Sequence, residues 1–383
     1  MDLLTQAGLY LHIPFCRSKC RYCSFFSFAP QSGDFQALVA SLRQQILQAA
    51  KLPELQGLEF ATFFIGGGTP SMLSPEVLAD LLALCRQSFS WSALTPEISI
   101  EVNPGTIDAK GLAQLRKAGF NRLSIGIQSL NDSELRRLGR IHSRKQALAT
   151  VNAARQAGFS NISCDLMYGL PGQSPDSWAR TLEEILSHGP QHLSLYELTV
   201  EEGTSFWDQV EKGQCVLPPE GEVLAMMDET QMRTKHAGLA RYEISNYALS
   251  GYQCRHNLNY WHNGFYLGLG PGAVSALGVE RRAAVADLHR YCRLVSGEQS
   301  VWEEVEQLES EAAFRETVIT GLRMTAGVSI SSLQQRFAID LSTYYGLVLT
   351  RLLDQGLLLQ EDDSLRLSSR GLALANQVMA ELV

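Results

Sequence analysis

The stretch LYLHIPFCRSKCRYCSFF, from Leu9 to Phe26, holds three cysteines, at Cys16, Cys20 and Cys23. It begins with LYLHI, a short apolar run of the kind that forms a buried β-strand. The cysteines follow this run with the spacing CxxxCxxC. We therefore expect a strand followed by a cysteine-bearing loop, and this stretch is the starting point for both the fold and the chemistry.

Further apolar runs follow along the chain, each before a longer helix-like stretch: FATFFIGG, EISIEVNP, RLSIGIQ, ISCDLMYGLPG and HLSLYEL. This alternation predicts repeated βα units around a parallel sheet. In AKGLAQLRKAGF the apolar residues have helical spacing, and Gly119 is placed to end that helix. Six units are fewer than the eight of a closed barrel, so we expect an α/β fold with an incomplete (β/α)6 barrel, open on one side.

The pattern changes after about residue 200, and we expect three parts. Residues 1–200 form the partial barrel with the cysteine loop, and residues 201–295 form an extension that carries the aromatic stretch RHNLNYWHNGFYLGLGPGA. Residues 296–383 form a small, mostly helical C-terminal domain. Within it, FAIDLSTYYGLVLTRLLDQGLLLQEDDSLRLSSRG predicts a helix and a two-stranded hairpin around Asp362 and Asp363, as in a winged-helix domain.

The composition excludes several classes of protein. A net charge of -8 argues against a general binder of nucleic acid or anionic membranes, and the glutamate-rich residues 300–383 argue against nucleic-acid binding by the C-terminal domain. No run of about 18 apolar residues and no signal peptide is seen, so we expect a cytoplasmic protein without an integral membrane segment. The other five cysteines are scattered singly, as core thiols are.

The clustered cysteines admit three interpretations. Their spacing is that of one helix face, so they could be small buried residues of a helix. A zinc site normally requires a fourth ligand, for which His12 is the only local candidate. An iron–sulfur cluster fits better, because thiolates are its usual ligands and three of them leave one iron open. Arg17, Lys19 and Arg21 would ease the negative charge of such a site.

Polar and glycine-rich residues also follow the other predicted strands. GGGTP (66–70) comes after one strand, and Glu101, Gln128 and Asp165 come after or within three others. Because the carboxyl ends of parallel strands meet at one rim, we expect these residues to converge on the cysteine loop. Taken singly, GGGTP could be only a tight turn and Glu101 a solvated strand end. An unpaired charge at Asp165, inside an apolar run, would be costly.

YLHIPFCRSKCRYCSF resembles the cluster loop of the radical SAM superfamily, including the aromatic residue Tyr22 before the last cysteine. In that family the open iron chelates the amino and carboxylate groups of S-adenosylmethionine. One-electron reduction then cleaves the sulfonium and yields a 5′-deoxyadenosyl radical. The resemblance implies a 4Fe-4S cluster held by Cys16, Cys20 and Cys23, with S-adenosylmethionine as a second cofactor.

One branch of this superfamily shows a further resemblance. It contains the oxygen-independent coproporphyrinogen III dehydrogenases (HemN) and the HemW family of haem chaperones, and its members share, in this order, the segments HIPFC, GGGTP, EVNP, GIQSLN followed by LGRIHS, and DLMYGLPGQ. The similarity covers roughly residues 8–290, and the C-terminal domain is of the family type as well. Arg136, Arg137 and Arg140 lie in a charged run typical of an exposed helix face. Only the resemblance selects Arg140 among them as a contact to the cofactor. The resemblance implies contacts to S-adenosylmethionine from Tyr10, Gly67, Gly68, Thr69, Glu101, Gln128, Arg140 and Asp165, with Tyr22 and Ser24 beside the cofactors.

Two features separate the relatives. The dehydrogenase loop is CxxxCxxCxC, whereas this chain has Phe25 at the last position, and only nine residues precede Tyr10 where the dehydrogenases have a longer segment. Both features favour the haem chaperones, although the aspartate that commonly follows their last cysteine is Ser24 here.

RHNLNYW resembles the HNxxYW motif associated with haem binding in HemW-like proteins. His256 could offer a neutral imidazole to the iron, and Tyr260 and Trp261 could offer flat apolar faces to the macrocycle. The alternative is a packed aromatic turn in which His256 is hydrogen-bonded in place.

The expected function is to bind haem and to deliver it to apo-haemoproteins, with membrane-bound respiratory enzymes as acceptors. The cluster and S-adenosylmethionine would then be a structural or regulatory site that promotes a homodimer, and we assign no catalytic residue. The protein would be cytoplasmic, with peripheral contact to the inner membrane. A radical enzyme that acts on coproporphyrinogen III or another tetrapyrrole stays open, as does a nucleic-acid-binding regulator. The sequence leaves open whether S-adenosylmethionine is cleaved and which protein accepts the haem.

Overall fold

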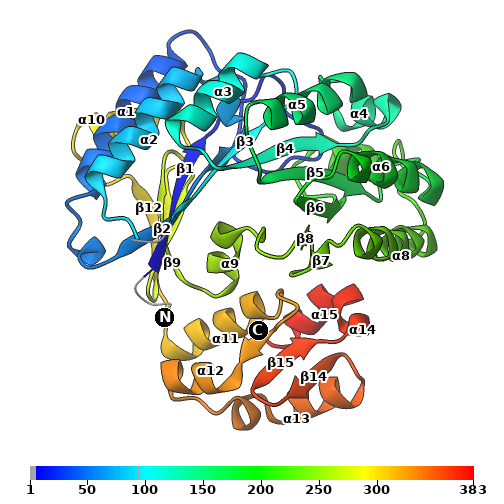
Figure 1. Ribbon diagram of the computed structural model, residues 1–383. Helices are drawn as coiled ribbons and strands as arrows, with labels where there is room; N and C mark the ends of the chain where they lie inside the picture. Colours follow the sequence, from blue (N-terminus) through cyan, green and yellow to red (C-terminus); the bar gives the residue numbers. More distant parts are fainter. Residues whose placement is uncertain (1–5, 93–94) are drawn as a thin grey trace.

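The computed structural model describes residues 6–92 and 95–383. Six parallel strands lie side by side in chain order, and helices cover the outer face of this curved sheet (Figure 1). The strands are β1 (Gln6–Ile13), β2 (Glu59–Gly67), β3 (Glu97–Val102), β4 (Arg122–Gln128), β5 (Ile162–Tyr168) and β6 (His192–Glu197). The connecting helices are α1 (Asp34–Ala49), η2 (Pro53–Leu55), η3 (Pro70–Met72), α2 (Pro75–Ser88), α3 (Ala109–Ala118), α4 (Asp132–Leu138), α5 (Arg144–Gln156) and α6 (Pro175–Ser187). The predicted incomplete barrel is confirmed.

Local sequence signals set the helix ends. The Asp108 side chain accepts a hydrogen bond of 2.7 Å from the Gly111 N–H and so caps the start of α3. Gly119 ends the same helix with a φ of 111°, in the left-handed region that glycine adopts without strain. The predicted stop at Gly119 is therefore confirmed.

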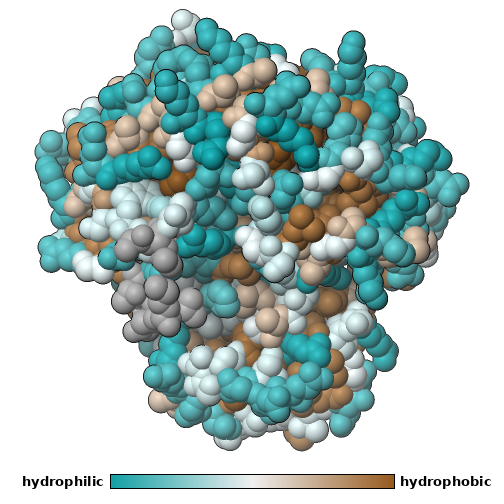
Figure 2. Space-filling view, viewed as in Figure 1, coloured by the Kyte–Doolittle hydropathy of each residue, from teal (hydrophilic) through white to brown (hydrophobic). Residues whose placement is uncertain are grey.

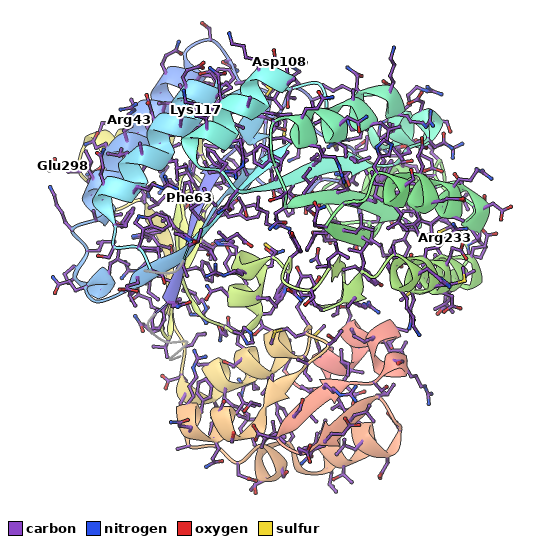
Figure 3. All side chains as sticks on the ribbon, in the orientation of Figure 1. Arg43, Phe63, Asp108, Lys117, Arg233 and Glu298 are labelled. Atoms are coloured by element: carbon purple, nitrogen blue, oxygen red, sulfur yellow. The ribbon has the colours of Figure 1, made fainter. Side chains whose placement is uncertain are left out.

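Side chains alternate across the barrel strands. On β1, Leu9, Leu11 and Ile13 are fully buried in the main hydrophobic core, whereas Tyr10 and His12 face an internal cleft. Figure 3 labels Phe63 of β2 in the interior and Arg43 of α1 at the periphery, where its side chain is 48% exposed. Each large apolar side chain buried in this way contributes about 1.5–3 kcal/mol to folding.

The sheet continues beyond both edges of the parallel core. β9 pairs parallel with β1 and leads to three antiparallel strands, and β8 and β7 extend the opposite edge from β6. These strands are β7 (Ala240–Arg241), β8 (Asn246–Ala248), β9 (Phe265–Leu269), β10 (Val274–Leu277), β11 (Glu280–Ala284) and β12 (Trp302–Gln307). The helices of this part are α7 (Ser205–Glu211), α8 (Glu220–His236), α9 (Arg255–Trp261) and α10 (Leu288–Ser296). The described residues thus form one 12-stranded sheet.

Residues 296–383, which the sequence analysis assigns to the C-terminal domain, begin with a strand that belongs to the large sheet. β12 lies inside the segment assigned to that domain, yet it pairs with β11 of the large sheet, and Val301 and Trp302 pack in the main core. The second core starts only with the helix that follows. The change of partner strand, rather than the change in sequence pattern, decides the boundary.

The C-terminal domain has the expected winged-helix-like order of elements. They are α11 (Ser310–Gly321), β13 (Val328–Ser329), α12 (Ile330–Phe337), α13 (Leu341–Asp354), β14 (Leu358–Glu361), β15 (Ser364–Leu367), α14 (Ser369–Ala373) and α15 (Ala375–Ala380). β14 and β15 form the predicted hairpin, and Asp362 takes a positive φ of 49° at its turn. The domain packs around its own apolar cluster and lies below the barrel in Figures 1 and 2.

Hydrophilic residues cover much of the face shown in Figure 2, with hydrophobic residues distributed between them. None of the helices in the described residues combines the length and the apolar character needed to cross a bilayer.

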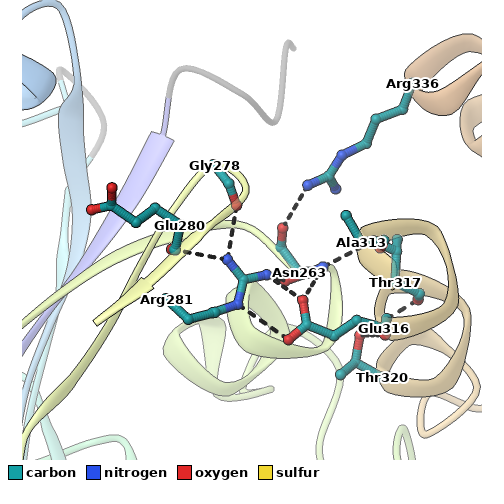
Figure 4. A network of polar contacts seen from close by, with 9 residues as sticks. All are labelled: Asn263, Gly278, Glu280, Arg281, Ala313, Glu316, Thr317, Thr320 and Arg336. Atoms are coloured by element: carbon teal, nitrogen blue, oxygen red, sulfur yellow. Dashed lines mark hydrogen bonds and ion pairs between the residues drawn. The ribbon is translucent and has the colours of Figure 1, made fainter. Parts of the chain in front are cut away.

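A polar network, which we call the interdomain network, joins the two domains (Figure 4). Arg281 of β11 forms an ion pair with Glu316 of α11. Asn263 donates to the Glu316 carboxylate at 3.0 Å and to the Thr317 hydroxyl at 2.9 Å. Arg336 donates to the Asn263 carbonyl at 3.2 Å. The C-terminal domain is thereby held against α9 and β11 by paired charges as well as by packing.

Candidate functional site

The three clustered cysteines lie in an irregular loop, because residues 14–33 contain no helix. The interpretation as a helix face is therefore wrong. The thiols of Cys16, Cys20 and Cys23 are free and partly exposed, and all three line one cavity of about 350 Å³, which we call the cofactor cavity. Burial raises the pKa of the Cys23 thiol, and the neighbouring Cys20 and Cys16 raise it further. Such thiols need a positive partner or a metal to stay ionised.

His12 is not available as a fourth ligand for zinc. Its Nε2 lies 2.9 Å from the Phe26 carbonyl, which can only accept, so Nε2 carries the proton. Its Nδ1 then accepts from the Tyr10 hydroxyl at 2.9 Å. Burial lowers the pKa of His12, which keeps the ring neutral. These bonds tie β1 to the cysteine loop instead.

The donor set fits a cluster better than a single ion. Among the described residues, no group of three His, Cys, Asp or Glu side chains is arranged around one metal position. A 4Fe-4S cluster takes one thiolate per iron, so its three sulfurs lie farther apart than the ligands of a single zinc ion. Cys16, Cys20 and Cys23 around a shared cavity match that requirement.

The GGGTP segment approaches the cysteine loop so closely that glycine is required. A Cβ atom on Gly68 would lie 2.7 Å from the Phe15 carbonyl oxygen and 3.0 Å from the Cys16 sulfur. Gly67 has a φ of 116°, and a Cβ atom there would lie 2.6 Å from the His12 ring. The Thr69 hydroxyl is 3.6 Å from the Cys16 sulfur. The segment therefore forms a wall of the cofactor cavity, as predicted for a binding element.

Two carboxylates face this cavity from β3 and β5, the strands on either side of β4. Glu101 accepts a hydrogen bond of 3.1 Å from the Gly67 N–H. Asp165 accepts hydrogen bonds of 2.7 Å and 3.0 Å from the Ser124 and Ser163 hydroxyls. Burial raises the pKa of Glu101 to about 8, and the negative charge of Asp165 adds to the effect. Burial raises the pKa of Asp165 as well. A cationic group bound between Glu101 and Asp165 would stabilise the ionised form of both carboxyls and lower their pKa values.

Arg140 reaches from the loop after α4 to the cysteine loop. It donates to the Cys20 sulfur at 3.5 Å, to the Asn103 side chain at 2.7 Å and to the Gly126 carbonyl. Asn103 in turn donates to the Thr69 hydroxyl at 2.7 Å. Sequence reasoning missed Asn103, although it lies in the EVNP segment two residues after Glu101 at the same strand end. That position was the signal that could have identified it.

The remaining predicted cofactor residues differ in position. Gln128 lines the cofactor cavity after a bulge in β4 and holds a positive φ of 66°, a strained conformation of a kind that clusters at binding sites. Tyr22 also lines it, and burial raises the pKa of its phenol. Ser24 is exposed and is absent from the linings of both cavities described here. Besides the cysteines, the cavity thus gathers Tyr22, residues 67–69, Glu101, Gln128, Arg140 and Asp165.

A second cavity, of about 510 Å³, adjoins the first, and we call it the aromatic cleft. Its aromatic walls are Tyr10, Phe25, Phe26, Tyr260, Trp261 and Tyr266, and Glu316 and Thr320 of the C-terminal domain line it as well. The two cavities share Phe25, Gly67 and Glu101. A ligand in the aromatic cleft would therefore lie next to the cofactor cavity.

The structure places His256 outside this cleft. The side chain is 1% exposed, its Nδ1 is 2.7 Å from the Thr62 hydroxyl, and its Nε2 is 2.8 Å from the Tyr260 hydroxyl. Burial lowers the pKa of His256 to about 3. Neither ring nitrogen is free to bind iron in this conformation, which matches the packed aromatic turn considered as the alternative. Tyr260 and Trp261 line the cleft, and their contact with a macrocycle stays a prediction.

Comparisons with known proteins agree with this geometry. Family models match residues 10–185 as "Radical SAM superfamily" and residues 308–374 as "HemN C-terminal domain". The chain is 34% identical over 369 residues to "Heme chaperone HemW" of Bacillus subtilis, which covers 96% of this chain and 97% of that protein. It is 40% identical over 278 residues to the Escherichia coli protein of the same name, which covers 71% of each.

A solved structure resembles this chain over almost its whole length. Escherichia coli coproporphyrinogen III oxidase (HemN), described as a radical SAM enzyme, superposes with a TM-score of 0.84 at 26% identity. The match covers 98% of this chain and 89% of that one.

Proposed function

The chain belongs to the radical SAM superfamily and, within it, to the HemW family of haem chaperones, and from this premise we propose that it binds haem and delivers it to apo-haemoproteins. The observation that carries the proposal is the aromatic cleft, which opens beside the cofactor cavity and has the size and apolar walls of a site for a cofactor-sized ligand. The acceptors in this proposal are membrane-bound respiratory enzymes. A cytoplasmic protein with peripheral contact to the inner membrane suits such acceptors.

The cofactor cavity would hold a 4Fe-4S cluster on Cys16, Cys20 and Cys23 and S-adenosylmethionine beside it. When bound, the reduced cluster can supply an electron that cleaves the sulfonium. The residues of this chain would bind and orient: Glu101 would receive the cationic amino group, and Gln128 and Asp165 would receive ribose hydroxyls. In this proposal the site is regulatory and promotes a homodimer.

Arg140 would hold this site together from one side. Its contacts to the Cys20 sulfur and to Asn103 support a role in fixing the cysteine loop against the strand ends. A guanidinium next to a thiolate also favours the ionised sulfur, which is the form that binds iron. Arg140 is therefore expected to support cluster binding as well as cofactor binding.

A radical enzyme is the second candidate, because the resemblance to HemN extends over almost the whole chain and the cofactor cavity is well formed. The residue two positions after Cys23 favours the chaperone over the radical enzyme. Phe25 stands where the dehydrogenase loop has a further cysteine, and its ring is 67% exposed between the two cavities. A phenyl ring there offers an apolar contact surface and no thiol.

Anaerobic assays of the reconstituted protein separate the two candidates. The chaperone is expected to bind haem in a fixed ratio, to transfer it to an apo-cytochrome, and to leave coproporphyrinogen III unchanged. Turnover of coproporphyrinogen III with formation of 5′-deoxyadenosine would instead establish the enzyme, and failure to bind haem would refute the chaperone. Cys20→Ser should lose the cluster, whereas Cys292→Ser, far from the loop in sequence and outside the cofactor cavity, should retain it.

A further inference from the structure

The aromatic cleft contains three phenols, and two of them are already committed to protein partners. The Tyr10 hydroxyl donates to His12 at 2.9 Å, and the Tyr260 hydroxyl is bonded to His256 at 2.8 Å. Tyr266 also lines the cleft, and its hydroxyl makes no hydrogen bond to another residue of the described chain. The residue is half-buried and its hydroxyl is accessible from the cleft, so its oxygen is available to a ligand bound there.

Most other polar groups of the cleft are occupied; the exception is the indole Nε1 of Trp261, which is buried and makes no hydrogen bond to the described residues but is a donor and cannot bind iron. Both nitrogens of His12 are bonded, as described above. The Glu316 carboxylate accepts from Arg281 and Asn263, and the Thr320 hydroxyl donates to the Glu316 backbone carbonyl at 2.8 Å. Glu101 lines both cavities, its Oε2 accepts from the Gly67 N–H, and its carboxylate is assigned above to the cationic amino group of S-adenosylmethionine. Apart from Glu101, Tyr266 is the described residue of this cleft whose iron-binding atom has no protein partner.

Arg281 also lines the cleft, as a hydrogen-bond donor, and all of its N–H groups already donate to protein acceptors (Figure 4). Its Nε and Nη2 donate to the Glu316 carboxylate, Nη2 also donates to Asn263, and Nη1 donates to the carbonyls of Gly278 and Glu280. The guanidinium therefore fixes the wall of the cleft and has no donor left for a propionate. Recognition in this cleft falls to the aromatic walls and to the Tyr266 oxygen.

Aromatic and exposed apolar side chains surround Tyr266 in the cleft. On β9 the residue pairs with Gly8 of β1, and the space beside Gly8 is taken by the His256 ring and the Thr62 hydroxyl. The Tyr260 ring meets the Tyr266 ring edge-on, with centroids 4.5 Å apart. Val274 is 44% exposed and Phe25 is 67% exposed, and both line the same cleft. Exposed apolar side chains that share one cavity present a contact surface, whereas scattered ones would need no explanation.

We propose that the aromatic cleft holds haem and that the Tyr266 phenolate oxygen is the protein ligand of its ferric iron. The proposal rests on the haem-binding function proposed above. An Fe–O bond forms, the phenol O–H bond breaks and its proton passes to solvent, and no electron is transferred. Tyrosine is one of the side chains that ligate haem iron in proteins.

The protonation state of Tyr266 gives this step a measurable consequence. Burial raises the pKa of Tyr266, the Glu316 carboxylate raises it further, and the Arg281 charge opposes them. The free phenol is therefore protonated at neutral pH, and iron binding releases the proton.

Two matched variants test the proposal in the full-length protein. Tyr266→Phe and Tyr260→Phe remove the same atom from neighbouring rings, and ferric haem is titrated into each while absorption and electron paramagnetic resonance spectra are recorded. Tyr266→Phe is expected to lose the spectrum of phenolate-ligated high-spin iron and to bind ferric haem about ten-fold more weakly, or about 1.4 kcal/mol. Tyr260→Phe is expected to keep the wild-type spectrum. Tyr266→His should convert the spectrum to that of histidine-ligated haem.

A wild-type spectrum in Tyr266→Phe, or loss of the spectrum in Tyr260→Phe, would overturn the assignment of Tyr266 and leave the proposed function standing. Failure of the wild-type protein to bind haem would overturn both. Thermal unfolding of each variant establishes that it is folded, and Tyr266→His gives an independent readout if the phenylalanine variant is unstable.

Discussion

Replacing Glu101 by glutamine is expected to flatten the dependence of the unfolding free energy on pH above neutrality. Burial raises the pKa of Glu101 from 4.5 to about 8 in the folded protein. Between these two pH values the folded state keeps a proton that the unfolded state has lost. The stability is therefore highest below pH 4.5 and falls as the pH rises towards 8, with respect to this group.

The magnitude follows from the pKa interval. At 1.36 kcal/mol per unit, the whole interval corresponds to about 5 kcal/mol. Buried histidines act in the opposite direction at lower pH, because the pKa of His256 is lowered to about 3 and that of His142 to about 4 from an ordinary value of 6.5. In the unfolded state they lose their protons around pH 6.5, and because the same histidines are present in the wild type and in Glu101→Gln, their contribution is common to both proteins. Between pH 6.5 and 8 the wild-type protein should lose about 2 kcal/mol more than Glu101→Gln.

Urea unfolding at several pH values within this window measures the difference. It is carried out on cluster-free protein under reducing conditions. The pKa of Asp165 is raised as well, and because its charge interacts with that of Glu101 the pH dependence removed by Glu101→Gln belongs to this pair of carboxyls. Glu304→Gln on the exposed strand β12 is the control and should behave as the wild type. Parallel pH profiles for the wild type and Glu101→Gln would refute the reasoning.

The same carboxyl couples pH to cofactor binding. If Glu101 receives the cationic amino group of S-adenosylmethionine, binding stabilises the carboxylate and releases its proton. The affinity should then rise with pH up to about 8 in the wild type and much less in Glu101→Gln. Calorimetric titration in two buffers of different ionisation enthalpy detects the released proton directly.

Gly68→Ala should lower the iron and sulfide content and destabilise the protein by about 1–3 kcal/mol, since its Cβ would collide with the Phe15 carbonyl and the Cys16 sulfur. Gly221→Ala, where nothing lies within 4 Å, is the control, and equal iron content in the two variants would contradict the prediction. Asn103→Ala removes the link between Arg140 and Thr69 and should weaken S-adenosylmethionine binding about ten-fold by calorimetry, or about 1.4 kcal/mol. An unchanged affinity would exclude this bridging role. Glu316→Gln leaves Arg281 without its ionic partner and should cost about 1–3 kcal/mol, with faster hydrogen exchange at α11. Exchange that matches the wild type would show that the interdomain network does not hold the domains together.

Much of the architecture was predictable because its signals are local. Apolar runs followed by helical stretches predicted the six βα units, and Gly119 marked a helix end that depends only on nearby backbone. The convergence of GGGTP, Glu101, Gln128 and Asp165 on the cysteine loop followed as well, since the carboxyl ends of parallel strands share one rim. The pairing of β12 with β11 in the large sheet was not predictable in this way, because it depends on contacts between distant segments.

The sequence by itself determined the order of the strands, the cysteine loop and the residue types gathered at the rim. Only the tertiary structure decided which polar atoms are committed and which are free. His256 is hydrogen-bonded to Thr62, 194 residues away in the chain, and Arg140 is hydrogen-bonded to Asn103 across 37 residues, while the Tyr266 hydroxyl has no partner among the described residues. Spacing along the chain carries the periodicity of helices and strands, but a hydrogen bond between distant residues depends on how the elements pack. Whether a side chain binds a ligand or belongs to the core is therefore decided by the tertiary structure.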